Sequence, residues 1–267
     1  MPEGPEVKII SDYLNLKLQN KFIHKIECIS VAYTHKYSEI INRINTFMPL
    51  KYCNAFCRGK NTFIKLKDDT YFTYHLGMTG YWSTKKSKHA HLKITSDSVN
   101  IYFHDTRRFG NINIINDKLL NTKYNINLDF LNNSKPINQQ IKYVLSLINT
   151  KREVCKVLLD QRYFLGVGNY LKSEILYRSK IHPETSWNKL NYTEMKLICK
   201  NTKESMQNSY FKGGAQIKDF KNPNSPSSLV LDIYNKIVTE DGLGVIKRKT
   251  TDNRISFWSP IIQKIKV

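Results

Sequence analysis

The chain has 267 residues, of which 40% are hydrophobic and 12% aromatic, and this composition indicates a globular protein and excludes a disordered one. Its 42 Lys and Arg residues against 22 Asp and Glu residues give a formal net charge of +20. Such an excess repels itself unless a polyanion or an anionic surface is the partner, so the charge favours nucleic acid as the partner.

The sequence carries no sign of a membrane span or of secretion. No apolar run approaches the roughly 18 residues that a span needs, and the opening residues MPEGPEVK lack the apolar core of a signal peptide. The five cysteines are scattered, which predicts reduced thiols in an intracellular protein. Cys53 and Cys57 have the spacing of half a metal site, but no second pair follows at finger-like spacing, so we expect structural roles for both.

The first half of the chain predicts one helix followed by strands. Apolar residues recur at helical spacing over about 5–19, which predicts an amphipathic helix there. Short segments with a period of two then predict strands at 21–31, 63–67, 71–76, 91–95, 99–103 and 111–115. Several short strands joined by tight turns favour an antiparallel sandwich or barrel over about 20–130.

The second half predicts helices followed by a hairpin. After a turn-rich break at 132–136, helical patterns cover 137–148, 153–160 and 170–179, and a capping box at Asn191 and Glu194 opens another helix. The last residues predict a hairpin with strands at 239–247 and 254–261. We therefore expect three domains: a β-sandwich at 1–131, a helical domain at 132–230 and a hairpin at 231–267.

The start of the chain carries candidate catalytic groups. A first Met before a small residue is normally removed, which would leave the secondary amine of Pro2 as the N-terminus. An α-amino group has a pKa of about 8, so a useful fraction is neutral at physiological pH and can attack an electrophilic carbon to form an iminium ion. Glu3 lies beside it and is suited to donate and accept the proton. Many proteins begin Met-Pro, however, so the dipeptide alone is weak support.

Longer motifs are more specific, and they occur in a fixed order. They are P-E-G-P-E-V at 2–7, R-G-K at 58–60, H-L-G-M-T-G at 75–80, D-T-R-R-F-G at 105–110, L-L-D-Q through G-V-G-N-Y to H-P at 158–183, G-G with K-D-F at 213–220, and R-I-S-F-W-S-P with Gln263 at 254–263. In content and order these motifs resemble those of the formamidopyrimidine-DNA glycosylase and endonuclease VIII family. The resemblance runs from residue 2 to residue 263.

The resemblance implies both a fold and a reaction. The fold is α+β, with an N-terminal antiparallel β-sandwich preceded by a helix, a C-terminal helix-two-turn-helix domain, and a β-hairpin finger. The reaction is that of a bifunctional DNA glycosylase and abasic-site lyase of base excision repair. Pro2 attacks the anomeric carbon of a flipped nucleotide while Glu3 protonates the sugar, the base leaves, and β- and δ-elimination cut the strand. No metal or organic cofactor is needed, and we expect a monomer that acts on damaged DNA.

The resemblance also implies which side chains contact DNA. Three of them fill the gap that the flipped nucleotide leaves in the stack, and these are Met78, Arg107 and Phe109. Four of them hold the flanking phosphates, and these are Lys60, His75, Asn169 and Arg254. Of these four, Lys60 and Arg254 belong with Pro2 and Glu3 as catalytic residues. Glu174, on the helix that Asn169 opens, has a supporting role near the site.

Two positions depart from the usual family pattern. The family finger is commonly a four-cysteine zinc site, but the last cysteine here is Cys199 and the last histidine is His182, so the hairpin has no Cys or His ligand for zinc. The chain thus resembles the zincless branch of plants, fungi, animals and viruses, and we expect Phe257, Trp258 and Ile261 to hold the hairpin by packing. Where the family often has a phosphate-binding lysine this chain has Cys155, with Lys156 one place on.

The segment 221–228 gives an expectation about the lesion. In the family that the chain resembles, members that favour 8-oxoguanine have a long, Gly-containing loop at this place, which closes over the flipped purine. Here the segment is short and contains two prolines, so it has fewer N–H groups to read a purine edge. We therefore expect activity on oxidised pyrimidines, hydantoins and ring-opened purines rather than on 8-oxoguanine.

Two other functions fit parts of the sequence. A non-catalytic nucleic-acid-binding protein is the main alternative, since a ribosomal protein also carries the helix-two-turn-helix motif. Pro2 and Glu3 favour the enzyme, because a pure binder needs neither an N-terminal proline nor an acid beside it. A metal-dependent nuclease would need a cluster of acidic ligands that the sequence lacks.

Overall fold

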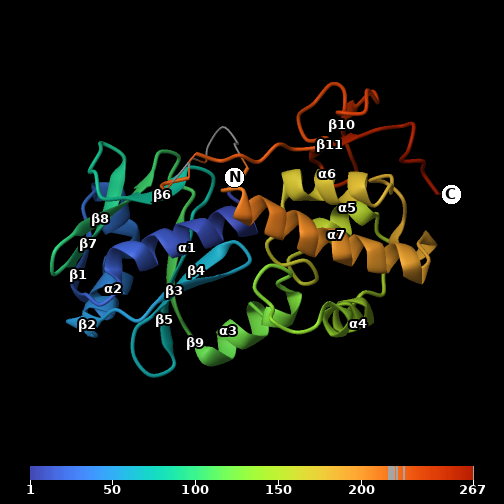
Figure 1. The fold of residues 1–267 in the computed structure, drawn as a ribbon. Coiled ribbons are helices and arrows are strands. Elements are labelled where there is room, and N and C mark those ends of the chain that lie inside the picture. Colours follow the sequence, from blue (N-terminus) through green and yellow to red (C-terminus); the bar gives the residue numbers. More distant parts are fainter. Residues whose placement is uncertain (216–219, 221, 225, 267) are drawn as a thin grey trace. The chain divides into compact units, whose positions relative to one another are not determined.

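The computed structural model describes residues 1–215, 220, 222–224 and 226–266 (Figure 1). The chain divides into two compact units. The first consists of residues 1–124 with the described part of 216–227, and the second of residues 125–215 with residues 228–266. The C-terminal hairpin therefore lies in the same compact unit as the helices, whereas the sequence predicted three domains with boundaries at 131 and 230.

The first unit is a helix-led antiparallel sandwich. Its helices are α1 (Gly4–Leu18), α2 (Val31–Asn45) and α3 (Asp117–Lys123). Its strands are β1 (Phe22–Cys28), β2 (Leu50–Lys51), β3 (Ala55–Arg58), β4 (Asn61–Lys65), β5 (Thr70–His75), β6 (Gly80–Ser83), β7 (Ala90–Ser96), β8 (Asn100–Asp105) and β9 (Asn111–Asn116). They form one sheet in the order β2-β1-β7-β8-β6 and another in the order β3-β4-β5-β9. The predicted fold class is confirmed for this unit.

Aromatic side chains join the two sheets of the sandwich. The ring of Trp82 on β6 lies 5.2 Å from that of Phe103 on β8 and 5.3 Å from that of Tyr74 on β5. All three are buried, and they come from both sheets, so the sheets share one core. Such rings contribute a large buried apolar area, and tilted or edge-on pairs are favoured over face-to-face stacking.

Helix α2 is missing from the sequence prediction. It buries Tyr33, Tyr37, Ile41 and Ile44, which recur at helical spacing along one face. Those four positions were the available signal, but the polar residues between them weaken the pattern. The helix matters for the site, because Tyr33 bonds to Asp105 at the end of β8 and Tyr37 bonds to the Gly110 carbonyl in the loop that follows.

The second unit contains the predicted helices and the hairpin. Its elements are η1 (Ile126–Leu128), α4 (Ile137–Leu147), α5 (Val154–Leu159), α6 (Asn169–Arg178), η2 (Trp187–Lys189), α7 (Tyr192–Phe211), β10 (Ile246–Lys249) and β11 (Ile255–Trp258). The predicted capping box is present: the Asn191 side chain accepts from the Glu194 N–H at 3.0 Å, and Glu194 accepts from the Asn191 N–H at 2.9 Å. Phe130 and Trp187 pack on Phe164 at the centre of this unit.

The hairpin strands are shorter than predicted. The first was expected at 239–247, but β10 begins at Ile246. Thr239 instead opens a tight turn, in which its N–H donates to the Leu243 carbonyl at 2.9 Å and its carbonyl accepts from the Gly242 N–H at 3.1 Å. Gly242 has a φ of +78°, which an Asp-Gly pair favours at a turn and which interrupts a strand.

Candidate active site

The first residues of the chain are buried at the start of α1. Pro2 is buried, while Met1 is 39% exposed. Glu3 is the N-cap of α1 and is only 3% exposed, and its backbone N–H donates to the Glu6 carboxylate at 2.8 Å. This capping interaction fixes the backbone next to Pro2. The sequence motif P-E-G-P-E-V therefore has a local physical reason, since the second glutamate holds the backbone of the first.

Two contacts set the direction in which α1 crosses the β3–β4 hairpin. Asn15 exchanges two hydrogen bonds with the backbone of Ala55, at 2.6 and 2.9 Å, where β3 begins. About one turn of α1 closer to the N-terminus, the Ser11 hydroxyl lies 3.1 Å from the Thr62 hydroxyl, and Thr62 is close to the hairpin turn. The Pro2 end of α1 therefore extends toward the turn that carries Lys60 (Figure 1).

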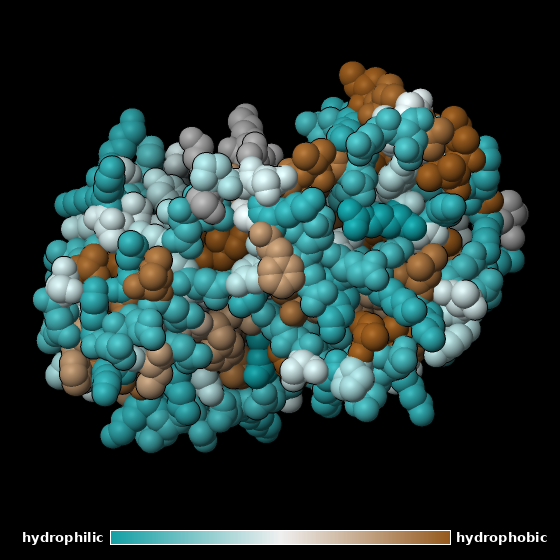
Figure 2. Space-filling view, in the orientation of Figure 1, coloured by the Kyte–Doolittle hydropathy of each residue, from teal (hydrophilic) through white to brown (hydrophobic). Residues whose placement is uncertain are grey.

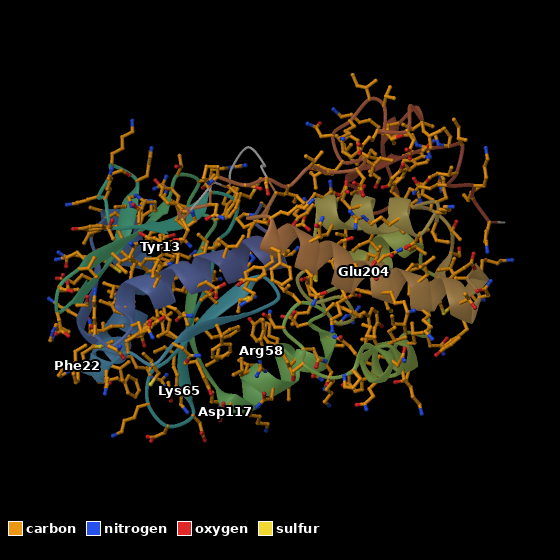
Figure 3. The ribbon with its side chains drawn as sticks, viewed as in Figure 1. Tyr13, Phe22, Arg58, Lys65, Asp117 and Glu204 are labelled. Carbon is orange, nitrogen blue, oxygen red and sulfur yellow. The ribbon has the colours of Figure 1, made fainter. Side chains whose placement is uncertain are left out.

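The Lys60 turn is tight and its base is fixed. Arg58 and Asn61 are paired, so Gly59 and Lys60 form a two-residue loop, and Gly59 has a φ of +58° that glycine adopts without strain. Arg58, labelled in Figure 3, donates to the carbonyls of Leu120 and Tyr124 at 3.2 and 3.1 Å. The hairpin base is thereby held to the end of α3.

His75 lies beside this turn at the end of β5. It pairs with Asn61, the residue after Lys60. Burial, and then the positive charge of Lys60, lower the pKa of His75. Its Nδ1 accepts from the Gly77 N–H at 2.9 Å, so a neutral His75 carries its proton on Nε2 and presents a donor there. Lys60 and His75 thus bring two donors together.

The loops that carry Met78 and Phe109 pack backbone against backbone. Gly77 has a φ of +64°, and a Cβ at this position would lie 2.6 Å from the carbonyl carbon of Phe109 and 2.7 Å from the nitrogen of Gly110. Any side chain there would force the loops apart. The glycine in H-L-G-M-T-G is therefore required by close approach as well as by its conformation.

A buried carboxylate, that of Asp105, holds both loops. It is 0% exposed, and it accepts from the Thr79 hydroxyl at 2.7 Å, from the Gly110 N–H at 2.6 Å and from the Tyr33 hydroxyl at 3.3 Å. The Thr79 oxygen in turn accepts from the Arg107 N–H at 3.0 Å. Sequence reasoning quoted Asp105 only as a motif letter and missed this role. A signal was available in the D-T-R-R-F-G motif, where an acidic residue stands just after a predicted strand and close to two arginines. A carboxylate that is buried at such a place needs hydrogen-bond donors from the residues around it.

The three residues expected to fill a DNA gap lie on these loops. Phe109 is 56% exposed, Arg107 is exposed and Met78 is half-buried. The Arg107 guanidinium lies 4.8 Å from the centre of the Phe109 ring, a cation–π distance. The structure therefore brings the three together on rigidly supported loops of the first unit.

In the second unit, Asn169 is the first residue of α6. Its Nδ2 donates to the Ile255 carbonyl at 2.9 Å, and its buried Oδ1 has no hydrogen-bond partner among the described residues. The preceding turn is spanned by the Gln161 side chain, which donates to the Leu159 and Val167 carbonyls, both at 2.9 Å. Asn169 is thus fixed beside the residue that follows Arg254.

Glu174 lies deeper than expected for a residue close to DNA. It is 3% exposed, and its carboxylate accepts from the N–H groups of Asp232, Ile233 and Tyr234 at 2.8, 3.0 and 2.8 Å. Burial raises the pKa of Glu174, and these three donors oppose that rise. The structure places Glu174 as a clamp on the segment that leads into the hairpin, and its role toward DNA stays a prediction.

Arg254 is exposed on the turn between β10 and β11. Its backbone N–H donates to the Asp252 carboxylate at 3.0 Å, and its carbonyl accepts from the Thr250 N–H at 3.0 Å. Asp252 also pairs with Lys172 of α6 at 2.6 Å. Sequence reasoning did not identify Lys172 or Asp252.

The hairpin packs on the helices through two of the three residues named from sequence. Phe257 and Trp258 are 5% and 3% exposed, and their rings lie 4.9 Å from Tyr234 and 5.1 Å from His182. The expectation for Ile261 is wrong, since it is 59% exposed. It lies beyond the end of β11, where the Gln263 side chain instead closes the turn by accepting from the Ser259 N–H at 2.9 Å.

The surface around the hairpin is partly apolar. Figure 2 shows hydrophobic side chains over this region at the upper right, interspersed with hydrophilic ones. Exposed hydrophobic residues of the segment include Ile237, Val238 and Ile246. Because these three side chains are exposed, they do not attach the hairpin. The buried rings of Phe257 and Trp258 and several polar contacts do so.

The cysteines and Lys156, which the sequence raised as possible metal or phosphate ligands, have the following surroundings. Cys53 and Cys57 are free thiols, one exposed and one buried. Cys155 is buried, and Lys156 pairs with Glu153 at 2.9 Å. Across the described ranges, no three His, Cys, Asp or Glu side chains cluster as a metal would require, and no helix is long and apolar enough to cross a membrane.

Comparison with known proteins matches most of the chain. The profile of the formamidopyrimidine-DNA glycosylase N-terminal domain matches residues 1–112, and that of the formamidopyrimidine-DNA glycosylase H2TH domain matches residues 133–221. A formamidopyrimidine-DNA glycosylase of Wolbachia from Brugia malayi is 30% identical over 84% of this chain and 83% of its own. That of Rickettsia bellii is 31% identical over 83% and 82%.

Solved structures are similar in fold over nearly the whole chain. The Lactococcus lactis Fpg in complex with DNA containing an abasic site has a TM-score of 0.81 at 21% identity, covering 98% of this chain and 99% of that one. MutM in complex with DNA containing carbocyclic 8-oxo-G has a TM-score of 0.82 at 22% identity, covering 98% and 100%. With its two matched domains and its relatives of about 30% identity, the chain belongs to the formamidopyrimidine-DNA glycosylase family, whose members are DNA glycosylases of base excision repair with abasic-site lyase activity.

Proposed function

We propose that this DNA glycosylase and abasic-site lyase uses the amine of Pro2 as its nucleophile and Glu3 as its proton donor and acceptor. The observation that carries the proposal is the start of α1. Pro2 is buried, and the adjacent Glu3 is buried at the helix N-cap with its backbone fixed by Glu6. A nucleophile and an acid held on consecutive, rigid residues meet the geometric need of covalent catalysis.

The reaction follows from these two groups. Once Met1 is removed, the neutral Pro2 amine attacks the anomeric carbon of the damaged nucleotide, and the bond to the base breaks. Glu3 protonates the sugar ring oxygen as the ring opens, which leaves an iminium ion between protein and DNA. Loss of a proton from the neighbouring carbon eliminates the 3′ phosphate, a second elimination releases the 5′ phosphate, and water frees the enzyme.

The proposed DNA contacts divide between the two units. In the first unit, Lys60 and His75 bind phosphate, while Met78, Arg107 and Phe109 fill the space left by the flipped nucleotide. In the second unit, Asn169 and Arg254 bind phosphate, and Glu174 supports them. Their support is the shared placement within each unit: Lys60 beside His75, Met78 against the Phe109 loop, and Asn169 bonded next to Arg254.

We further propose a monomer whose hairpin needs no zinc. The hairpin sequence holds no Cys or His, and Phe257, Trp258, Lys172 and Glu184 give it other attachments. Elemental analysis should find no stoichiometric zinc, and prolonged treatment with a strong chelator should leave activity and melting temperature unchanged. Inactivation by the chelator would contradict the proposal.

For the lesion, we propose oxidised pyrimidines, hydantoins and ring-opened purines in preference to 8-oxoguanine. The support is the sequence of 221–228, with Pro223 and Pro226; Lys221 and Ser225, like Lys218 and Asp219 before them, lie outside the described residues. A single-turnover series in one duplex context, with cytosine opposite each purine lesion, measures the preference. Excision of 8-oxoguanine as fast as of a hydantoin would show that the loop argument is wrong.

The central experiment is borohydride trapping on duplex DNA with an abasic site. Borohydride reduces an iminium to a stable amine, so the proposed intermediate gives a covalent protein–DNA adduct, and peptide mapping should locate the adduct at Pro2. A protein that binds this DNA but yields no adduct would instead support the alternative of a non-catalytic nucleic-acid-binding protein.

A further inference from the structure

A buried ion pair lies beneath the hairpin turn in the second unit. The Lys172 ammonium on α6 is 2.6 Å from the Asp252 carboxylate, and the two side chains are 0% and 3% exposed. Withdrawing two charges from water is costly, and the close approach of the two opposite charges offsets part of that cost. The pair therefore fixes Asp252 against α6.

The same carboxylate also holds the turn backbone. While its Oδ2 bonds Lys172, its Oδ1 accepts from the Thr250 hydroxyl at 2.7 Å and from the Arg254 N–H at 3.0 Å. A continuous path of hydrogen bonds thus runs from α6 through Asp252 to the backbone of Arg254. The hydroxyl of Thr250 lies 2.6 Å from that of Ser256 on β11, which ties the two sides of the turn together.

A second contact from α6 holds the other side of Arg254. Asn169 lies three residues before Lys172, so both side chains leave the same face of the helix. Asn169 donates to the carbonyl of Ile255, directly after Arg254, at 2.9 Å. Side chains on one face of α6 therefore hold the chain both before and after the exposed Arg254.

We infer that Lys172 is a positioning residue for Arg254: through Asp252 it fixes the turn from which Arg254 reaches a DNA phosphate. The inference rests on the proposed role of Arg254. A side chain that must meet a reacting strand within a fraction of an ångström needs a fixed backbone, since a shift of about 1 Å can cost on the order of 100-fold in rate. In a hairpin whose sequence offers no Cys or His ligands, the buried pair supplies that constraint from 80 residues away.

The test is a double-mutant cycle between Lys172 and Arg254. Wild type, Lys172→Met, Arg254→Ala and the double variant are compared by single-turnover cleavage of an abasic-site duplex, with the melting temperature as the measure of folding. Lys172→Met should slow cleavage by about tenfold or more. In the Arg254→Ala background, the same change should cause no further loss, because its effect is transmitted through Arg254. A general structural defect would instead add to the Arg254 defect.

Two further variants complete the design. Lys25→Met, which removes an exposed lysine on β1 of the first unit, controls for the lost charge and should retain the wild-type rate. If Lys172→Met fails to fold, Lys172→Met/Asp252→Asn replaces it in the cycle. This variant keeps the amide oxygen that accepts from Thr250 and Arg254 and leaves no buried charge unpaired, so it should fold but cleave more slowly than wild type.

Cleavage at the wild-type rate by either Lys172 variant, or losses that multiply independently with Arg254→Ala, would overturn the inference. The proposed Pro2 chemistry is tested separately by borohydride trapping with the wild-type protein. If wild type forms no adduct, Pro2 chemistry fails, and the affinities of the same four proteins for the abasic-site duplex still decide whether Lys172 acts through Arg254.

Discussion

Two aspartates with buried carboxylates hold exposed loops in the two units, and they do so with different partners. In the sandwich, Asp105 accepts from neutral donors, namely the hydroxyls of Thr79 and Tyr33 and the N–H of Gly110. In the helical unit, Asp252 pairs with the Lys172 ammonium. The sandwich loops also press directly on each other at Gly77, where a Cβ would lie 2.6 Å from the carbonyl carbon of Phe109.

The difference teaches how each loop obtains its rigidity. The two sandwich loops already pack against each other, so hydrogen bonds from neutral donors to one carboxylate are sufficient to hold them in place. A two-stranded hairpin is marginal by itself and must be anchored to another element. One of its anchors is a lysine 80 residues earlier, so at the turn of the hairpin an ion pair contributes what close backbone packing contributes in the sandwich.

The largest expected effect is a loss of base excision, without loss of DNA binding, when Pro2 has no free amine. Extending the chain by one uncleaved residue before Pro2 converts its amine to an amide, which cannot attack. Base excision should fall by at least about 10³-fold, while affinity for an abasic-site duplex persists. Pro2→Gly, which keeps a primary amine, should retain part of the activity. Full glycosylase activity in a protein shown by mass spectrometry to retain Met1 would disprove this role of Pro2.

Next in size is the loss of the arginine that the helical unit positions. Arg254→Ala should lower single-turnover cleavage by about 10²-fold because it removes the charged group that we propose to bind phosphate, and the melting temperature should stay within a degree or so. Lys264→Ala, another exposed cation near the C-terminus, is the matched control and should cleave at nearly the wild-type rate. Normal turnover in the Arg254 variant would refute its assignment.

The corresponding change in the sandwich should act on stability first. Asp105→Ala leaves the Gly110 N–H and two hydroxyls without their acceptor, and we expect a loss of about 3 kcal/mol in the free energy of unfolding. Asp105→Asn keeps one acceptor oxygen, so its loss should be smaller. Urea denaturation measures both. An unchanged midpoint for the alanine variant would mean that the loops are held by the Gly77 contact alone.

The smallest effect tests the dependence of the helical unit on charge. Hydrogen bonding from Arg162 lowers the pKa of Asp160 to about 2, from an ordinary value of 3.8. A depressed carboxyl pKa stabilises the folded state above the unfolded pKa, and that stability is lost as the pH falls through the folded value. Because Arg162 is 75% exposed, we expect only about 1 kcal/mol at pH 7.

Asp160→Asn should therefore lower the free energy of unfolding at pH 7, with the difference from wild type shrinking between about pH 4 and pH 2. Asp12→Asn, which removes a partly exposed carboxylate paired with Lys8, provides the control and should change stability little. A difference for Asp160→Asn that is the same at pH 7 and pH 2 would exclude ionisation as its cause.

Much of the fold and of the candidate site could be predicted from local patterns. The helix at α1, the hairpin at Asp68 and Asp69 and the capping box at Asn191 all depend on residues within a few positions of one another. The same holds for the motif glycines, since Gly59 and Gly77 adopt positive φ values within their own turns. Such features can be predicted from sequence because the residues that cause them lie close together in the chain.

Other features could not be predicted because their causes are distant. Ile261 has the hydrophobicity of a packing residue, yet it is exposed, because burial depends on what the chain places opposite it. The expected strand at 239–247 was shortened by the turn at Gly242, where the dipeptide signal competed with β-branched neighbours. Helix α2 was missed because polar residues separate the apolar positions of its buried face, and only the contacts of α2 with β1 and β9 in the folded chain decide that this face is buried.

By itself, then, the sequence determined the class of the protein, the succession of a strand-rich half, a helical part and a hairpin, and the identity of the residues carried by its motifs. Only the tertiary structure decided which groups hold those residues in place: Tyr33 and Thr79 around Asp105, and Lys172 beneath the turn of Arg254. The physical reason is that a buried charge is stable only where donors converge on it, and here those donors come from segments 26 to 80 residues away.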